Sequence, residues 1–249
     1  MDLNPFNVYI NGMKNRLNLL SKRICDLKLD LTKSPLFSYV QELYDELAAR
    51  KLIFRPPCYF ADEWFVPEGD PVIGIPFFLA NKKLMGLEKK LTGDVEGDTK
   101  NYFMKLLRHE AGHALCYAFK LNRLKKVQSV FGSSNKKFSE TYRFNPRSKN
   151  YVINLKDYYA QSHPDEDFAE TFAVWLSHSQ EALEKKYKGW NATKKLVILS
   201  RLMKDIENKA PLIKTGKKMC HVTTLKYTLS TYYKRKCALQ SQHLRVHEK

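Results

Sequence analysis

Apolar side chains recur every three or four positions over several long stretches of the chain, which is the pattern of amphipathic helices. The third of these stretches follows Asp98 and Thr99, and either side chain can cap the first turn of a helix. The fourth opens with Ser162 as a cap and Pro164 in the first turn. The spacing predicts helices over residues 9–28, 36–50, 99–121, 162–183 and 191–208.

The pattern changes between residues 58 and 80, where aromatic and β-branched residues are punctuated by Pro and Gly. Within this region Val72–Leu79 has the composition of a strand. Pro76 lies inside it and cannot donate to a ladder hydrogen bond, so we expect an edge strand. The sequence therefore predicts an α+β fold that is mainly helical, with a small sheet near its centre.

Composition narrows the class of protein. The chain has 249 residues, enough for a full core, and 43% of them are apolar. No stretch approaches about 18 consecutive apolar residues, so we expect no membrane span. No secretory signal is recognisable at the N-terminus, and the five cysteines are scattered without a CxxC pair. We therefore predict a cytoplasmic protein without disulfides.

The net charge of +17 is concentrated toward the C-terminus. From Arg201 onward there are 12 lysines and arginines against three acidic residues, a net charge of +9. Lysines and arginines interleave with Tyr227, Tyr232 and Tyr233 in this region. The pattern fits either a solvated basic helix face or a surface that binds nucleic acid.

One short motif carries specific chemistry. His109-Glu110-Ala111-Gly112-His113 reads HExxH, and residues four apart lie on the same face of a helix. Both imidazoles can then bind one zinc ion, with Glu110 beside it as a general base. The flanking residues are apolar, so this helix is expected to be buried, and a surface helix that carries these residues by chance is disfavoured. Gly112 suggests that another segment approaches closely there.

A catalytic zinc usually takes a third protein ligand. Glu166 and Glu170 lie on one stripe of the predicted helix 162–183, opposite an aromatic stripe expected to be core. We assign Glu166 as the ligand and Glu170 as an acceptor for a ligand His N–H. His163 is a competing ligand or donor, although its position favours a cap. Tyr159 is the preferred donor to an oxyanion.

These residues resemble the gluzincin metallopeptidases, in which HExxH is completed by a Glu on a later helix. The chain is distantly similar to the anthrax lethal factor catalytic domain and to the Pro-Pro endopeptidases. It is more similar to a group of bacterial zinc-binding metallopeptidases. That similarity spans about residues 25–210 and includes the motifs Asp62–Pro67, Ile75–Phe78, Val95–Gly97, Arg108–His113, Tyr159–Leu176 and Tyr187–Trp190.

The resemblance implies a zincin-like fold with one zinc ion per chain, bound by His109, His113 and Glu166. It also implies that Glu110 is the base and that Tyr159 stabilises the oxyanion. Val72–Leu79 would be the edge strand over the site, paired with an extended peptide or protein substrate. The expected organisation is N-terminal helices and sheet over 1–98, a zinc-binding part of the same domain over 99–210, and a basic extension over 211–249.

Two alternatives use the same motif differently. A DNA-associated metalloprotease similar to the SprT-like group would take His163 as the third ligand in place of Glu166. A non-enzymatic protein would bind nucleic acid through its basic C-terminal region and use zinc only for structure. Structural zinc sites favour four protein ligands, commonly Cys, and no cysteine is suitably spaced here. The sequence indicates no particular oligomeric state.

Overall fold

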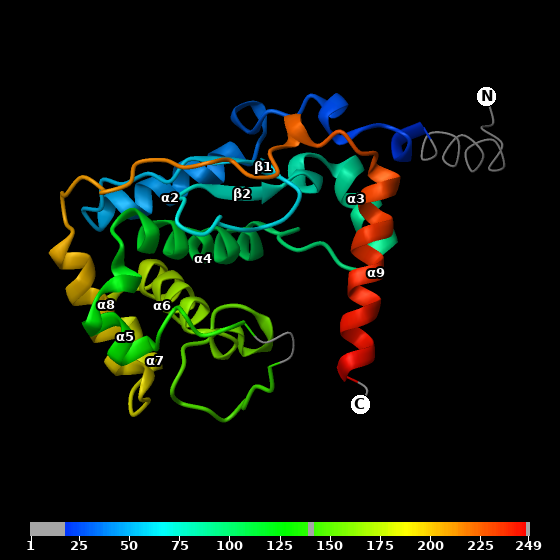
Figure 1. Ribbon diagram of the computed structural model, residues 1–249. Coiled ribbons are helices and arrows are strands. Elements are labelled where there is room, and N and C mark those ends of the chain that lie inside the picture. Colours follow the sequence, from blue (N-terminus) through cyan, green and yellow to red (C-terminus); the bar gives the residue numbers. More distant parts are fainter. Residues whose placement is uncertain (1–17, 139–141, 248–249) are drawn as a thin grey trace, which may run out of the picture.

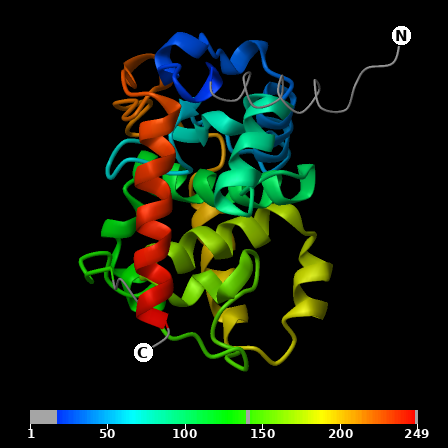
Figure 2. The same cartoon turned by 90° about the vertical axis from the view of Figure 1, so that its right-hand side faces the viewer.

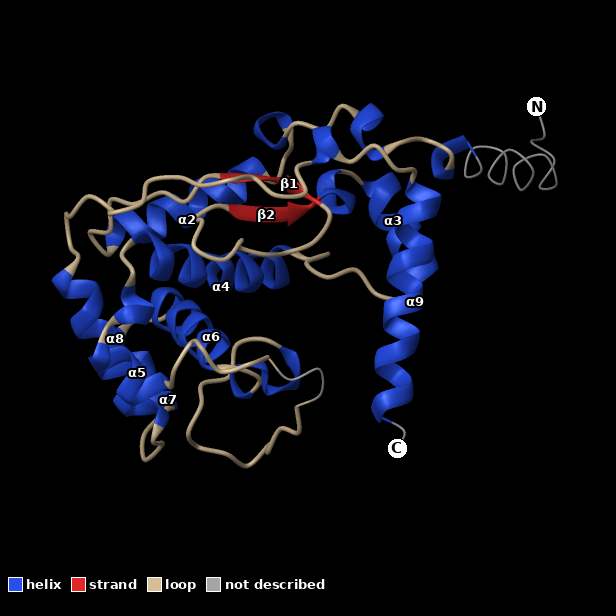
Figure 3. Ribbon diagram, in the orientation of Figure 1, coloured by secondary structure: helices blue, strands red, loops and turns tan. Residues whose placement is uncertain are grey.

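The structure is a computed structural model that describes residues 18–138 and 142–247. Helices dominate it, and the strands form one small sheet (Figure 3). The two strands are β1 (Cys58–Ala61) and β2 (Ile73–Pro76). The α-helices are α2 (Phe37–Ala49), α3 (Lys82–Thr92), α4 (Lys100–Ala118), α5 (Lys125–Phe131), α6 (Pro164–Ser177), α7 (Gln180–Lys186), α8 (Ala192–Asp205) and α9 (Leu229–His247). Short 3₁₀ helices cover Ile24–Leu27, Leu31–Lys33, Phe77–Ala80, Leu121–Arg123, Lys156–Gln161 and Val222–Thr224.

The elements are stacked in layers around α4. The sheet lies on one side of α4 and α6 lies on the other, with α5, α7 and α8 grouped beyond α6 (Figure 1). The predicted mainly helical α+β composition is confirmed. The helices predicted over 36–50, 99–121 and 191–208 are present as α2, α4 and α8. Thr99 caps α4 through a hydrogen bond from the N–H of Tyr102, as one of the two predicted caps.

The helix predicted over 9–28 is only partly testable and is wrong at its C-terminal end. Residues 9–17 lie outside the described residues. Residues 18–20 are helical, but the chain then leaves the helix, and Lys28 has a φ of 50°. The N–H groups of Ile24 and Cys25 donate to the carbonyl oxygens of Tyr227 and Leu225. Tertiary hydrogen bonds to the C-terminal segment thus replace the helical bonds expected from spacing alone.

The helix predicted over 162–183 is two helices. It begins at Pro164 with His163, not Ser162, as its N-cap, and ends at Ser177 before α7 starts. Arg50 explains the break, because its guanidinium donates to the carbonyl oxygens of Trp175 and His178 at 3.0 and 2.5 Å. A cation that binds the last carbonyls of a helix stabilises its end.

The strand predicted over Val72–Leu79 is shorter, and its predicted exposed edge is wrong. β2 ends at Pro76 and pairs in parallel with β1, with Cys58 opposite Ile73. On its other side Gly74 exchanges both backbone hydrogen bonds with Phe65, at 2.9 and 3.4 Å. A Cβ at Gly74 would lie 2.9 Å from the Phe65 ring, so only glycine allows this approach. The segment around Phe65 therefore covers the edge that was expected to meet a substrate.

Gly112 lies at a close contact between α4 and α6. A Cβ at this position would lie 2.9 Å from the Cα of Ala169 and 3.1 Å from the Cβ of Phe172. The close approach expected from the mid-helix glycine is therefore present. Phe172 is fully buried, and Phe168 and Trp175 are buried as well, so the expected core role of the aromatic stripe of α6 is confirmed.

The C-terminal region packs against the rest of the chain. Leu229, Tyr232 and Tyr233 are buried in the main hydrophobic core. α9 packs against α3 and continues past it, and Figure 2 shows it crossing the near face of the molecule. Lys236 forms ion pairs with Glu63 at 3.0 Å and with buried Glu88 at 2.9 Å. Among the described residues, no helix has the length and apolar character needed to cross a bilayer.

Candidate metal centre

α4 presents the HExxH residues from inside the protein. It is buried along most of its length, and His109 is 3% exposed. His113 lies one helical turn further on, and its ring centroid is 4.9 Å from that of His109. The two Nε2 atoms are 3.1 Å apart. The expected alignment of the two imidazoles on one helix face is therefore present.

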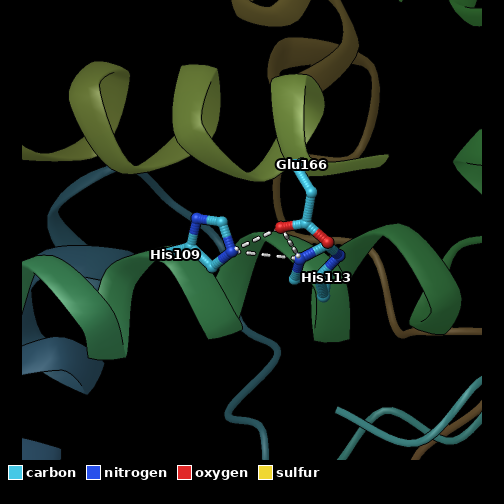
Figure 4. A group of neighbouring side chains, drawn as sticks. All are labelled: His109, His113 and Glu166. Carbon is cyan, nitrogen blue, oxygen red and sulfur yellow. Dashed lines mark hydrogen bonds and ion pairs between the residues drawn. The ribbon is translucent and has the colours of Figure 1, made fainter. Parts of the chain in front are cut away.

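α6 brings Glu166 to the same point from the other side (Figure 4). Its Oε2 atom lies 3.0 Å from Nε2 of His109 and 3.2 Å from Nε2 of His113. Two nitrogens and one oxygen thus form a nearly equilateral triangle. Among the described residues these three side chains form the only group whose ligand atoms are close enough to share a metal ion.

The triangle has the dimensions of a zinc site. Zinc bonds to His and carboxylate are about 2.0–2.1 Å long, and in a tetrahedron two such ligand atoms are about 3.3 Å apart. The observed separations of 3.0–3.2 Å are close to that value. Three ligand atoms in this arrangement leave a fourth position open, which distinguishes a catalytic zinc from a closed structural one.

Glu170 fixes the orientation of His109, as its position one turn after Glu166 suggested. Its Oε1 accepts from Nδ1–H of His109 at 2.8 Å. The same carboxylate accepts from the side-chain amide of Asn154 at 2.8 Å and from the N–H of Leu155 at 2.9 Å. The proton on Nδ1 leaves the lone pair of Nε2 directed at the triangle.

Asn154 is a site residue that sequence reasoning missed. It is 8% exposed and lies in the irregular segment before α6. No periodicity or spacing connects it to HExxH. A polar residue between Val152 and Leu155 is a weak signal by itself, because its role appears only when the loop meets Glu170.

The pKa values of His109 and Glu166 depend strongly on each other and on the neighbouring charges. Burial opposes protonation of His109, but hydrogen bonds and charges from Glu166 and Glu170 raise its pKa well above the usual range. Burial also opposes ionisation of Glu166, yet His113 and His109 together hold the pKa of this carboxyl well below its usual range. A metal cation that binds here must displace a proton from the imidazoles, as metal ligands generally require.

Glu110 and Tyr159 lie beside the triangle and line the same cavity. Burial raises the pKa of Glu110, and the charge of Glu166 adds to the rise while the histidines oppose it. The ring centroid of Tyr159 is 5.7 Å from that of His109. Burial and the charges of Glu166 and Glu110 raise the pKa of Tyr159 well above its usual range. Its hydroxyl therefore stays protonated and remains a hydrogen-bond donor.

His163 is outside the triangle. Its Nδ1 accepts from the N–H of Asp165 at 3.2 Å, and its Nε2–H donates to the carbonyl oxygen of Lys136 at 2.6 Å. The ring also stacks on Phe138 with centroids 3.7 Å apart. Both nitrogens are thus occupied, and the capping interpretation is confirmed. The alternative in which His163 replaces Glu166 as a ligand does not fit this arrangement.

A cavity of about 860 Å³ opens over the triangle. One wall consists of Trp64, Phe65 and Val66, the segment that covers β2. Tyr142 and Tyr159 also line the cavity. No residue of β2 lines the cavity, so the expected edge strand is replaced at this place by residues 64–66.

Two of the three tyrosines in the basic C-terminal region are buried and cannot stack on bases. Tyr232 and Tyr233 are buried, and the hydroxyl of Tyr227 donates to Asp62 at 3.3 Å. Single-stranded nucleic acids commonly bind by stacking on exposed aromatic rings. The pattern that suggested a nucleic-acid surface therefore comes partly from core tyrosines.

Comparison with known proteins shows which family the chain belongs to. A buried His-His-Glu group on two helices that line one cavity defines a candidate metal-binding site. Residues 100–235, more than half of the chain, match the sequence model of a family described as "putative zinc-binding metallo-peptidase". The chain belongs to this family. No curated protein and no solved structure shows significant similarity to it.

The matched region differs from the one expected from motifs. It begins at residue 100, just before HExxH, and extends to residue 235, into the basic C-terminal region. The match therefore includes α4, α6 and the first turns of α9.

Proposed function

We propose that this protein hydrolyses peptide bonds with one zinc ion per chain, bound by His109, His113 and Glu166. The observation that carries the proposal is the triangle of ligand atoms with sides of 3.0–3.2 Å at the floor of a large cleft. A zinc ion bound there supplies Lewis-acid polarisation of a carbonyl and lowers the pKa of a water molecule.

Glu110 is the proposed general base. It follows His109 directly on α4, so the helix that holds two ligands also fixes this carboxylate against the cleft. Burial raises the pKa of Glu110, and a carboxylate at this position is suited to exchange a proton with the attacking water. Its carboxylate accepts a proton from the attacking water and then passes it to the leaving amine nitrogen.

Tyr159 is the proposed donor to the carbonyl oxygen of the scissile bond. Its protonated hydroxyl and its place in the cleft wall beside His109 suit a group that stabilises developing negative charge. The preceding residues hold it there, since Asp157 and Tyr158 both adopt left-handed backbone conformations, with φ of 56° and 51°. Two such residues in succession are unusual away from functional sites.

The proposal is tested by separating zinc binding from catalysis. Zinc-loaded wild type should cleave peptides in a proteome-derived mixture, and mass spectrometry identifies the new termini. Glu110→Gln should keep its zinc and lose at least about 1,000-fold in activity, as expected when a general base and its proton transfer are removed. Glu184→Gln, which removes an exposed carboxylate on α7, is the matched control and should retain both zinc and activity. Full activity in Glu110→Gln would refute the mechanism.

A further inference from the structure

The cleft follows one face of α4 from end to end. Tyr102, Leu106, His109, His113 and Tyr117 all line it. Tyr102 and Tyr117 are 15 positions apart, which corresponds to roughly 22 Å along a helix. At about 3.3 Å per residue, an extended peptide of about six or seven residues fits this length. The metal-ligand triangle lies between the two ends, so residues on both sides of a scissile bond can contact the cleft.

The cleft is lined mainly by acidic side chains, although the chain as a whole is strongly basic. The chain carries +17, yet carboxylates outnumber lysines among the residues that line the cavity. At the Tyr102 end the lining residues are Asp94, Glu96 and Asp157 with a single lysine, Lys156. A cleft lined by one sign of charge concentrates ligands of the opposite sign.

Glu96 is held at this end by a rigid loop. The indole N–H of Trp64 donates to the carbonyl oxygen of Glu96 at 3.4 Å. The next residue, Gly97, has a φ of 90°, and a Cβ there would lie 3.3 Å from Leu79 and 3.4 Å from Trp64. The loop therefore has little freedom to move, and among the described residues the Glu96 carboxylate forms no ion pair. Lys236 and His109 are near enough for their charges to act on Glu96, but neither forms an ion pair with it. The carboxylate therefore lines the cleft as an anionic group that has no cation in direct contact.

Lys156 shows that this end of the cleft can bind the cationic group of a side chain. Its ammonium lies 3.6 Å from the Asp94 carboxylate and 5.2 Å from the centroid of the Tyr102 ring. A carboxylate and an aromatic face together are a favourable setting for a cation. Lys156 compensates Asp94 only, which leaves Glu96 and Asp157 able to bind a second cation.

We propose that Glu96 is a specificity-determining residue that binds a lysine or arginine side chain of the substrate at the Tyr102 end of the cleft. The inference rests on the proposed peptidase function and deepens it by assigning a substrate class, namely peptides with a basic residue a few positions from the scissile bond. The packed loop places the backbone of Glu96 before binding, so that only its side chain has to be ordered in the contact.

The first test maps cleavage sites. A proteome-derived peptide mixture prepared by cutting after glutamate retains internal lysines and arginines, and mass spectrometry gives the residues around each new terminus. Zinc-loaded wild type should show lysine and arginine enriched at one position on one side of the cleaved bond. Glu96→Gln should lose that enrichment, and Glu96→Lys should replace it with aspartate, the acidic residue that such a mixture retains at internal positions. Glu184→Gln, matched in charge but outside the cleft, should keep it.

The second test uses one pair of synthetic peptides that differ only by Lys or Gln at the enriched position. The wild type should favour the Lys peptide about three- to tenfold in kcat/KM, the range expected for a partly solvated ion pair. The ratio should fall to about 1 in Glu96→Gln. It should also fall with added salt, because screening weakens exposed charge pairs. Equal zinc content in all variants shows that the metal centre is intact.

The outcomes separate the two proposals. Cleavage without lysine or arginine enrichment, or enrichment that survives in Glu96→Gln, overturns the role of Glu96 and leaves the peptidase function standing. If zinc-loaded wild type cleaves no peptide, the peptidase proposal fails. A fluorescently labelled peptide with several lysines and the same peptide with glutamine at each of those positions are then compared by anisotropy on the zinc-loaded protein. Equal affinities overturn the role of Glu96 independently.

Discussion

Gly112→Ala tests how closely the metal centre depends on the packing of α4 against α6. The added Cβ would lie 2.9 Å from the Cα of Ala169, 3.2 Å from its carbonyl oxygen and 3.1 Å from the Cβ of Phe172. The closest partner is backbone, which cannot rotate away. The two helices must therefore separate by about 0.5 Å or more to restore ordinary contact distances near 3.5–4.0 Å.

Two effects of opposite sign set the stability of this variant. Alanine is about 1 kcal/mol more favourable than glycine in a helix interior. Overpacking a closely packed core costs about 1–3 kcal/mol. We therefore expect a net loss of about 0–2 kcal/mol, which for a chain of this size lowers Tm by up to about 8 °C.

Gly112→Ala should also weaken zinc binding. His109 and His113 are on α4 and Glu166 is on α6, so a shift of about 0.5 Å between the helices opens two sides of a triangle that measure 3.0 and 3.2 Å. We expect zinc affinity to fall about tenfold or more, within the range seen when the surroundings of metal ligands are disturbed. Competition with a chromophoric chelator measures the affinity, and thermal unfolding measures Tm.

Gly86→Ala is the matched control. Gly86 lies inside α3, and a Cβ there would have no heavy atom within 4 Å. This variant should gain about 0.5–1 kcal/mol from helix propensity, with unchanged zinc affinity. If Gly112→Ala were also stabilised and bound zinc as tightly as wild type, the account of the helix contact would be refuted.

Further predictions concern the groups around the site and the docking of α9. Glu170→Ala should lower zinc affinity about 10- to 100-fold, because Nδ1 of His109 loses its acceptor; chelator competition measures this. His163→Asn should keep one zinc per chain, because this residue caps α6 outside the ligand group; elemental analysis checks it. Zinc affinity should fall as pH is lowered, because the raised pKa of His109 means that protons compete for the site over a wider pH range; titrations at several pH values test the sign. Lys236→Met should destabilise the protein by about 2–4 kcal/mol by leaving Glu88 buried without its cation, and Glu88→Gln in the same chain should restore much of the loss; denaturant unfolding gives both values.

The sequence was most informative where chemistry and periodicity coincide. HExxH on an apolar helix indicated both the burial of α4 and the alignment of its imidazoles. The stripe of Glu166 and Glu170 followed from helical spacing, because one turn separates the group that faces the triangle from the group that supports His109. Gly112 indicated a close approach for a physical reason that the structure bears out.

Sequence reasoning failed where tertiary contacts decide local structure. Arg50, which follows α2 and is distant in sequence, binds the last carbonyl oxygens of α6. The local signal for the break is Ser179, which caps α7, and sequence reasoning missed it. The segment around Phe65 covers β2, which no alternation pattern could indicate because Gly74 alone permits it. Asn154 joins the site only through a loop whose path depends on the whole fold.

The most direct test of the account is the zinc content of freshly purified wild type and Glu166→Ala, measured side by side by inductively coupled plasma mass spectrometry. Glu166 supplies the oxygen of the triangle, at 3.0 and 3.2 Å from the two imidazole nitrogens. The account predicts about one zinc per wild-type chain and a large loss in the variant, as expected when one of three protein ligands is removed. A wild type that binds no zinc even after zinc is added, or a variant that retains full occupancy, would contradict it.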